Sequence, residues 1–232
     1  MRRLATYAIA PTSTDRVYFA HVFAWMAAAL AVTGGVSAAV GHDQRALNAI
    51  FAGGFPFVFL GLVVIQVLLV GGLVGLVQHM DEATAAAIFL AYAAITGLTV
   101  SIIFAVYTTK SIFATFLITA AMFAALAIAG YTTNIDLTSW GAFLGMALFG
   151  QLIGLVVNLF WLNDTLYWIT TVVGILLFSA YTAYDVQRLK QYETEGGDTE
   201  TVEKESIVGA LALYLDFINL FLYLLRLFGR RR

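Results

Sequence analysis

The strongest constraint on this chain is its alternation of long apolar runs with short polar breaks. Each run is long enough to cross a hydrocarbon core of roughly 30 Å as a helix. Because unpaired backbone groups are too costly in lipid, these runs are expected to be helices rather than open strands. The pattern predicts an all-α integral membrane protein with seven transmembrane helices, near Val17–Val40, Phe55–Val77, Ala83–Tyr107, Ser111–Gly130, Trp140–Trp161, Tyr167–Leu189 and Ser206–Phe228.

Composition agrees with this class. The chain has 232 residues, of which 61% are hydrophobic and 11% charged, and its mean hydropathy is +0.89. A water-soluble domain of this size is less apolar. We expect an N-terminal segment over 1–16, the transmembrane domain over 17–228 and a basic C-terminal tail over 229–232. The lipid bilayer is the expected partner, and no nucleic acid is expected to bind.

The longest connection, Lys190 to Glu205, is rich in charged residues and is expected to be mobile. An alternative is that the sixth helix runs on to about Gly196 and the seventh starts near Thr201. Within the spans, small residues recur at a spacing near four, which favours close packing of helix backbones. They are Gly34, Gly35, Gly71, Gly72, Gly75, Gly141, Gly145, Gly150 and Gly154.

Two carboxylates stand out because an ionisable side chain inside a span costs about 2.5–3.5 kcal/mol on insertion scales. In the sixth span, Tyr181, Asp185 and Arg188 follow one another at i, i+4 and i+7 and share a helical face. In the seventh span, Asp216, Asn219 and Tyr223 share a face with small residues. Both faces are expected to point into the bundle.

Asp185 and Asp216 are expected at similar depths. At about 1.5 Å per residue they lie about 16 and 22 Å from a common surface. Two carboxylates that meet in a low-dielectric interior cannot both stay ionised at ordinary cost, so the pair can share a proton and sense pH. Two structural alternatives stay open: Asp185 pairs with Arg188 near the surface, or Asp216 makes a buried packing hydrogen bond.

Uncharged polar residues could line the same interior. Gln151 and Asn158 are seven apart on the fifth span and are candidates for an ion pathway, or for interhelical hydrogen bonds alone. Gln66 and His21 are expected to be packing or interfacial residues. Asp185 and Asp216, with Asn219, offer the hard oxygen ligands that calcium prefers, without a preformed cage.

Three stretches carry a resemblance to a known family. Phe178–Lys190 and Leu213–Arg226 closely resemble the last two helices of the Bax inhibitor-1 family, and Thr96–Thr99 resembles a further element of it. The resemblance implies seven helices with the last one central and surrounded by the other six. It also implies a bacterial inner-membrane protein and a pH-sensitive calcium leak, in which the paired aspartates, here Asp185 and Asp216, exchange a proton.

One position departs from the family pattern. Bacterial relatives can carry an arginine near the end of the second span that latches onto the sixth-helix aspartate, and the matching position here is His79. Histidine is mostly neutral above about pH 6.5, so a cationic latch would be weak at neutral pH. Protonation is expected to draw His79 toward Asp185.

Two functions fit the sequence. The first is a calcium leak channel or transporter gated by the aspartate pair. The second is an interaction protein that modulates membrane proteolysis or stress responses, with the acidic stretch Glu193–Glu205 as its contact. A retinal protein is excluded because lysine occurs only at positions 110, 190 and 204. No serine–histidine constellation lies inside the spans, so we expect neither an enzyme nor a cofactor.

Overall fold

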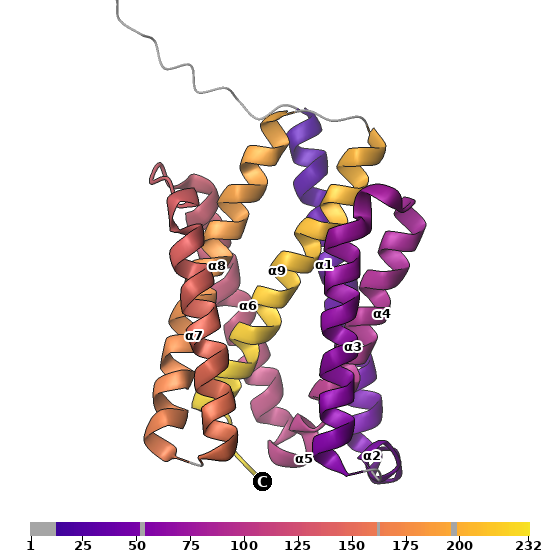
Figure 1. Cartoon of the computed structure of the whole chain (residues 1–232), viewed down its shortest axis with the longest axis vertical. Coiled ribbons are helices and arrows are strands. Elements are labelled where there is room, and N and C mark those ends of the chain that lie inside the picture. Colours follow the sequence, from indigo (N-terminus) through magenta and orange to yellow (C-terminus); the bar gives the residue numbers. More distant parts are fainter. Residues whose placement is uncertain (1–12, 52–53, 162, 196–198) are drawn as a thin grey trace, which may run out of the picture.

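The computed structural model describes residues 13–51, 54–161, 163–195 and 199–232 (Figure 1). These residues form a bundle of long helices joined by short connections. The helices are α1 (Ser13–His42), α2 (Gln44–Phe51), α3 (Phe55–Leu76), η1 (Val77–His79), α4 (Glu82–Val100), α5 (Ile103–Val106), α6 (Thr109–Thr132), η2 (Thr138–Trp140), α7 (Gly141–Phe160), α8 (Asp164–Glu195) and α9 (Thr199–Phe228).

The predicted seven transmembrane helices are confirmed: seven helical stretches are long and apolar enough to span a bilayer. The third predicted span is divided, because α4 ends at Val100 and α5 resumes at Ile103. The short helix α2 was not predicted. Its first turn is capped by Asp43, whose Oδ1 accepts hydrogen bonds from the backbone N–H groups of Arg45 at 2.8 Å and Ala46 at 3.3 Å.

The last helix lies at the centre of the bundle, as predicted. It crosses the bundle obliquely (Figure 1) and packs against α1, α4, α6 and α8. In its most apolar stretch 72% of the residues are buried, compared with 6% in the span that contains α3 and 11% in the span that contains α7. Helix α3 packs on α4, and α7 packs on α8. These two outer helices therefore face lipid over most of their surface.

Polar side chains cap two of the transmembrane helices. Asp81 precedes α4, and its carboxylate accepts hydrogen bonds from the Thr84 hydroxyl at 2.6 Å and the Thr84 N–H at 3.3 Å. These bonds hold the pKa of Asp81 below its usual value. Thr108 caps α6 in the same way, since its hydroxyl accepts from the N–H of Ser111 at 3.4 Å. Both helices thus begin where a side chain satisfies an otherwise unpaired donor.

Glycine packing differs from the prediction. A Cβ atom at Gly34, Gly35, Gly71, Gly72, Gly75, Gly145 or Gly150 would meet no atom within 4 Å, so the expected close approach is wrong at these positions. The expected close packing is present at Gly141 and Gly154, where a Cβ would lie 2.6 Å from the Tyr184 hydroxyl and 3.1 Å from Thr170 Cγ2 on α8. Close helix contacts that the spacing did not predict occur at Gly97 and Gly174, where a Cβ would lie 2.8 and 2.6 Å from an atom of α1 and α9, and at Gly130, where it would lie still closer to the Ala183 carbonyl oxygen on α8. Spacing alone does not indicate which face of a helix meets a neighbour.

The expected mobile connection from Lys190 to Glu205 is mostly helical, so that prediction is wrong for the residues described. Helix α8 continues to Glu195 and α9 starts at Thr199, which agrees with the alternative reading. Residues 196–198 lie outside the described residues, as do 1–12 of the predicted N-terminal segment. Charged residues form a helix readily once it leaves the bilayer, because water solvates their side chains while the backbone bonds continue.

The basic C-terminal tail is fixed to the opposite end of the bundle. An isolated antiparallel bridge joins Arg231 to Tyr107. The N–H of Thr108 donates to Arg230 O at 3.1 Å, and the N–H of Arg232 donates to Val106 O at 3.0 Å. Hydrogen bonds to the Tyr167 and Tyr107 phenols raise the pKa of Arg231 further above its ordinary value. The tail therefore ties α9 to the start of α6.

Candidate functional site

Two cavities meet inside the bundle at Asp185. The larger one, about 710 Å³, is lined by residues of α3, α4, α7, α8 and α9. The smaller one, about 320 Å³, reaches toward the end of the bundle where α8 and α9 connect, and its wall includes Gln78, Arg188 and Glu205. Asp185 lines both cavities, whereas Asp216 lines only the larger one. Together the two cavities extend from that end of the bundle toward its middle, and a few polar side chains stand in their largely apolar walls.

The structure brings Asp185 and Asp216 together. Their carboxyl groups lie within hydrogen-bonding reach of each other, although Asp185 is near the end of its span and Asp216 is in the middle of its own. Helix α9 runs obliquely across the bundle (Figure 1), so a residue in the middle of α9 can contact one nearer the end of α8. Asp216 is 4% exposed, and its Oδ2 has no hydrogen-bond partner among the described residues. An oxygen in that position must carry a proton, meet an ion or meet water.

Arg188 lies one turn beyond Asp185 and acts on it electrostatically. Its side chain is exposed and lines the smaller cavity. The charge of Arg188 and the contact with Asp216 therefore act on the same carboxyl group, and a direct ion pair of Asp185 with Arg188 stays a prediction. Asp185 stands between a cation on its water-exposed side and a second carboxyl group on its buried side.

Gln151 joins three helices at the inner end of the larger cavity. Its Nε2 group on α7 donates to the backbone carbonyl of Thr170 on α8 at 2.6 Å and to the phenol of Tyr223 on α9 at 2.8 Å. The Tyr223 ring stacks on Phe178 with centroids 5.9 Å apart and lies against the backbone at Gly174. Gln151 therefore makes interhelical hydrogen bonds and also lines the cavity.

The other predicted pathway residues divide into two groups. Asn219 and Tyr181 line the larger cavity, and the amide of Asn219 donates to Leu215 O on its own helix at 2.8 Å. Asn158 does not line this cavity. It lies near the end of α7 and donates to Asn163 O at 3.3 Å. The pathway prediction is wrong for Asn158, because seven residues advance a helix by about 10.5 Å even when they return it to the same face.

His79 is not brought to Asp185. It ends η1 with an exposed side chain, and among the described residues no hydrogen bond or ion pair joins it to Asp185. The neighbouring Gln78 lines the smaller cavity instead. Gln78, rather than His79, therefore shares a cavity wall with Asp185.

A buried polar chain escaped the sequence analysis. The Thr33 hydroxyl on α1 donates to Ala93 O at 2.8 Å and lies 2.6 Å from the Tyr214 phenol on α9. Since a hydroxyl has one proton, Tyr214 is the donor in that second bond. On α3, Gln66 donates to Thr96 Oγ1 at 2.8 Å, as expected for a packing residue. The threonines gave no signal in the sequence because they are common within apolar spans.

A second carboxyl pair also went unpredicted. The side chains of Glu82 on α4 and Glu203 on α9 lie within hydrogen-bonding reach of each other, and His21 on α1 is close enough to act on Glu82 electrostatically. Three helices that are distant in sequence meet at this point. In the sequence these residues are scattered charges at span ends, which are ordinarily solvated and unrelated.

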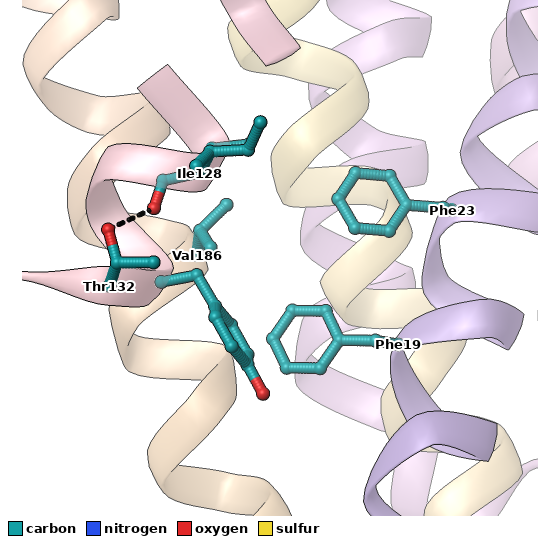
Figure 2. Close-up of a pocket in the computed structure, with 7 residues that line it drawn as sticks. Phe19, Phe23, Ile128, Thr132 and Val186 are labelled. Atoms are coloured by element: carbon teal, nitrogen blue, oxygen red, sulfur yellow. Dashed lines mark hydrogen bonds between the residues drawn. The ribbon is translucent and has the colours of Figure 1, made fainter. Parts of the chain in front are cut away.

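An apolar groove on another flank offers a contrast. Figure 2 shows it between α1 and α6, where Phe19 and Phe23 face Ile128 and Thr132, with Val186 behind them. Its volume is about 380 Å³. The Thr132 hydroxyl donates to Ile128 O at 2.7 Å and is therefore satisfied. The described residues of its wall include no carboxylate, so its chemistry is that of a lipid-facing surface.

The site offers few ligands for a metal ion. Among the described residues, no group of three or more His, Cys, Asp or Glu side chains is arranged to bind a metal ion. Two carboxyl groups supply at most four oxygens, whereas calcium takes about six to eight. Water and the nearby Asn219 amide would have to complete the shell. Such an arrangement suits brief occupancy rather than storage.

Comparison with known proteins finds relatives over most of the chain. The family described as "Inhibitor of apoptosis-promoting Bax1" matches residues 15–232. The inner membrane protein YbhL of Escherichia coli K12 is 42% identical over 227 residues, which cover 97% of this chain and 96% of that protein. An uncharacterized protein of Borreliella burgdorferi is 39% identical over 93% of this chain and 92% of its own length.

A further relative is the uncharacterized protein RP147 of Rickettsia prowazekii, which is 37% identical over 94% of this chain and 91% of its own length. These relatives are bacterial, and one is named as an inner membrane protein. With the seven apolar helices, they identify a multi-pass protein of the bacterial inner membrane. The chain belongs to the Bax inhibitor-1 family, as a bacterial member.

Proposed function

We propose that this protein is a passive pathway for calcium ions across the bacterial inner membrane, controlled by proton sharing between Asp185 and Asp216. One observation carries the proposal. Asp216 is buried in mid-span, lines the larger cavity beside Asp185, and has an oxygen that no described residue satisfies, while Asp185 lines both cavities. A purely structural hydrogen bond could be made by a serine or asparagine at lower cost.

The electrostatics give the pair two states. When both carboxyl groups are ionised, the site attracts a divalent cation. Without a cation, the two carboxylates repel each other. When the pair shares a proton, half of that charge is gone and a hydrogen bond holds α8 and α9 together. Proton concentration therefore acts on both the attraction for calcium and the contact between the two helices. Catalysis plays no part in this proposal.

The second candidate, an interaction protein, rests on the charged segment between Lys190 and Glu205. That segment is helical over most of its length in the described residues, so a partner would meet two helix ends rather than an extended loop. Conduction and interaction make different demands. A purified channel conducts in vesicles that contain no other protein, whereas an interaction protein is silent there.

The test is calcium flux into vesicles that contain only the purified protein, measured across a pH series. The parent is expected to conduct, with a rate that changes with pH. Asp216→Asn keeps the size and an acceptor oxygen but cannot ionise, so its flux should lose the pH dependence. Asp136→Asn is the matched control, because Asp136 is exposed outside the spans and bonds only to nearby residues of its own turn.

Two results would contradict the proposal. One is the absence of flux above protein-free vesicles at every pH. The other is an Asp216→Asn protein with the same flux–pH curve as the parent. If Asp216→Asn does not fold, Asp185→Asn provides the same comparison from the other half of the pair. Unfolding of the first variant together with a silent second variant would make Asp216 a structural hydrogen-bond acceptor.

His79 has a separate test. If its protonated form pairs with Asp185, the flux of the parent should show a shifted or bell-shaped response below about pH 6.5. The His79→Ala protein should then lose that part of the response while it retains the rest. Identical curves for the parent and His79→Ala would show that this histidine has no part in gating.

A further inference from the structure

The larger cavity opens to the side of the bundle, between α3 and α7. Val67 on α3 and Leu152 on α7 both line it, yet their side chains are 64% and 51% exposed. Both residues lie well inside membrane spans, so the opening faces lipid chains rather than water. In Figure 1 the two helices stand on either side of the oblique α9. An occupant can therefore enter this cavity from the bilayer.

The interior of this cavity is acidic. Asp185 and Asp216 both line it, and the described residues of its wall include no lysine, arginine or histidine. Asp216 Oδ2 is buried without a hydrogen-bond partner among the described residues. Arg188, the cation that acts on Asp185, lines the other cavity. The lateral cavity thus presents an unpartnered carboxyl oxygen at the end of an apolar entrance.

Aromatic rings add a second attraction for cations. Tyr92, Phe178, Tyr181 and Tyr223 all line the same cavity. The face of an aromatic ring attracts an ammonium group, most strongly where water is excluded, and aromatic walls are a recurrent feature of sites for substituted ammonium ions. A hydrated metal ion cannot cross lipid to reach this entrance, but an organic cation with an apolar tail can.

We infer that the cavity between α3 and α7 binds lipophilic ammonium compounds, which enter from the bilayer and place their nitrogen beside Asp216. The apolar tail would lie between Val67 and Leu152, at the entrance. A volume of about 710 Å³ is within the range of sites for drug-sized molecules. The inference goes beyond the calcium pathway and does not depend on it, because it concerns binding from the lipid side.

The groove between α1 and α6 supplies an internal contrast. It is apolar and faces lipid, but no carboxylate lines it. A cation with an apolar tail gains only hydrophobic contact there. If tail burial alone drove binding, the two hollows would be equivalent and a neutral compound of the same tail length would compete equally in both.

The experiment measures binding of radiolabelled dodecyltrimethylammonium to the full-length protein in phosphatidylcholine nanodiscs, with empty nanodiscs subtracted. We expect saturable binding of about one molecule per chain. Loss of the carboxylate in Asp216→Asn should weaken the affinity about tenfold or more. Asp136→Asn should leave the affinity unchanged, because Asp136 is exposed outside the spans.

A second variant guards against misfolding of the first. Gly71 lines the cavity, and a Cβ there would meet no atom within 4 Å, so Gly71→Leu should fold and fill part of the space. Its binding should fall, while Gly145→Leu, at a glycine that is equally open but outside this cavity, should bind as the parent does.

Several outcomes would overturn the inference. They are binding no greater than that of empty nanodiscs, equal displacement by dodecanol at the same bilayer concentration, and parental affinity in both Asp216→Asn and Gly71→Leu. Calcium flux is read separately. Binding of the probe without calcium flux would support this inference and contradict the proposed function. Calcium flux without binding of the probe would support the proposed function and contradict this inference.

Discussion

The contact between α6 and α8 at Gly130 permits a prediction of some precision. A Cβ atom at Gly130 would lie 2.3 Å from the carbonyl oxygen of Ala183 and 2.8 Å from its Cα. Both are backbone atoms, so no rotamer change can relieve the clash, and α6 must move away from α8. Gly130→Ala should therefore lower the stability of the folded protein in detergent.

The magnitude follows from two opposing terms. Overpacking costs up to about 3 kcal/mol, and alanine returns about 1 kcal/mol through its higher helix propensity, which leaves a net loss of about 2 kcal/mol. Gly34 is the matched control, because a Cβ there meets no atom within 4 Å. Gly34→Ala should gain about 1 kcal/mol by propensity alone. The two variants should thus differ by about 3 kcal/mol.

Thermal unfolding in one detergent, followed by circular dichroism, measures this difference. For a chain of this length, 3 kcal/mol corresponds to about 6–12 °C between the two melting temperatures, with Gly130→Ala the lower. Equal melting temperatures would refute the reasoning, since they would mean that α6 and α8 do not touch at this glycine. A lowered value for both variants would instead indicate that Gly34 is also packed.

Three further predictions concern single side chains. Gln151→Leu removes two interhelical hydrogen bonds, and Gln66→Leu removes one. At about 0.6 kcal/mol for each bond, Gln151→Leu should lower the stability about twice as much as Gln66→Leu in the thermal unfolding assay. Asp81→Ala should lower the melting temperature at neutral pH, with a difference from the parent that persists down to about pH 4. Because the folded pKa of Asp81 is lowered, this difference should shrink only as the pH falls further, through the folded value, and a constant difference down to pH 2 would contradict it. Arg231→Ala should release the C-terminal bridge. Carboxypeptidase should then remove the tail faster than it does in the control variant Arg45→Ala.

The sequence predicted the spans and the central acid pair for a physical reason. Lipid imposes a minimum apolar length and makes every charge costly, so hydropathy alone locates helices and marks Asp216 as unusual. Neither rule acts outside the bilayer. The short helix α2 was therefore not predicted. The helical extensions of α8 and α9 were only an alternative to a mobile connection, because their charged residues resemble those of a solvated loop.

Predictions about which residues meet were less successful, and the reason is geometric. A helical face shared by Gln151 and Asn158 fixes direction but not depth, and their separation along the axis takes Asn158 out of the cavity. The spacing of Gly71 and Gly75 likewise marks a stripe of small residues without stating what covers it. The contact at Gly130 depends on a backbone atom of a distant helix, for which the sequence holds no local signal.

The helical extensions of α8 and α9 have a mechanical consequence. Glu195 stands about 15 Å along α8 from Asp185, and Thr199 stands about 25 Å along α9 from Asp216, and each helix runs unbroken between the two points. Helices are stiff over such lengths, so each extension is connected through one continuous helix to one carboxyl group of the pair. A protein that bound these extensions would therefore touch the same two helices that carry the acid pair, at a distance of several helical turns.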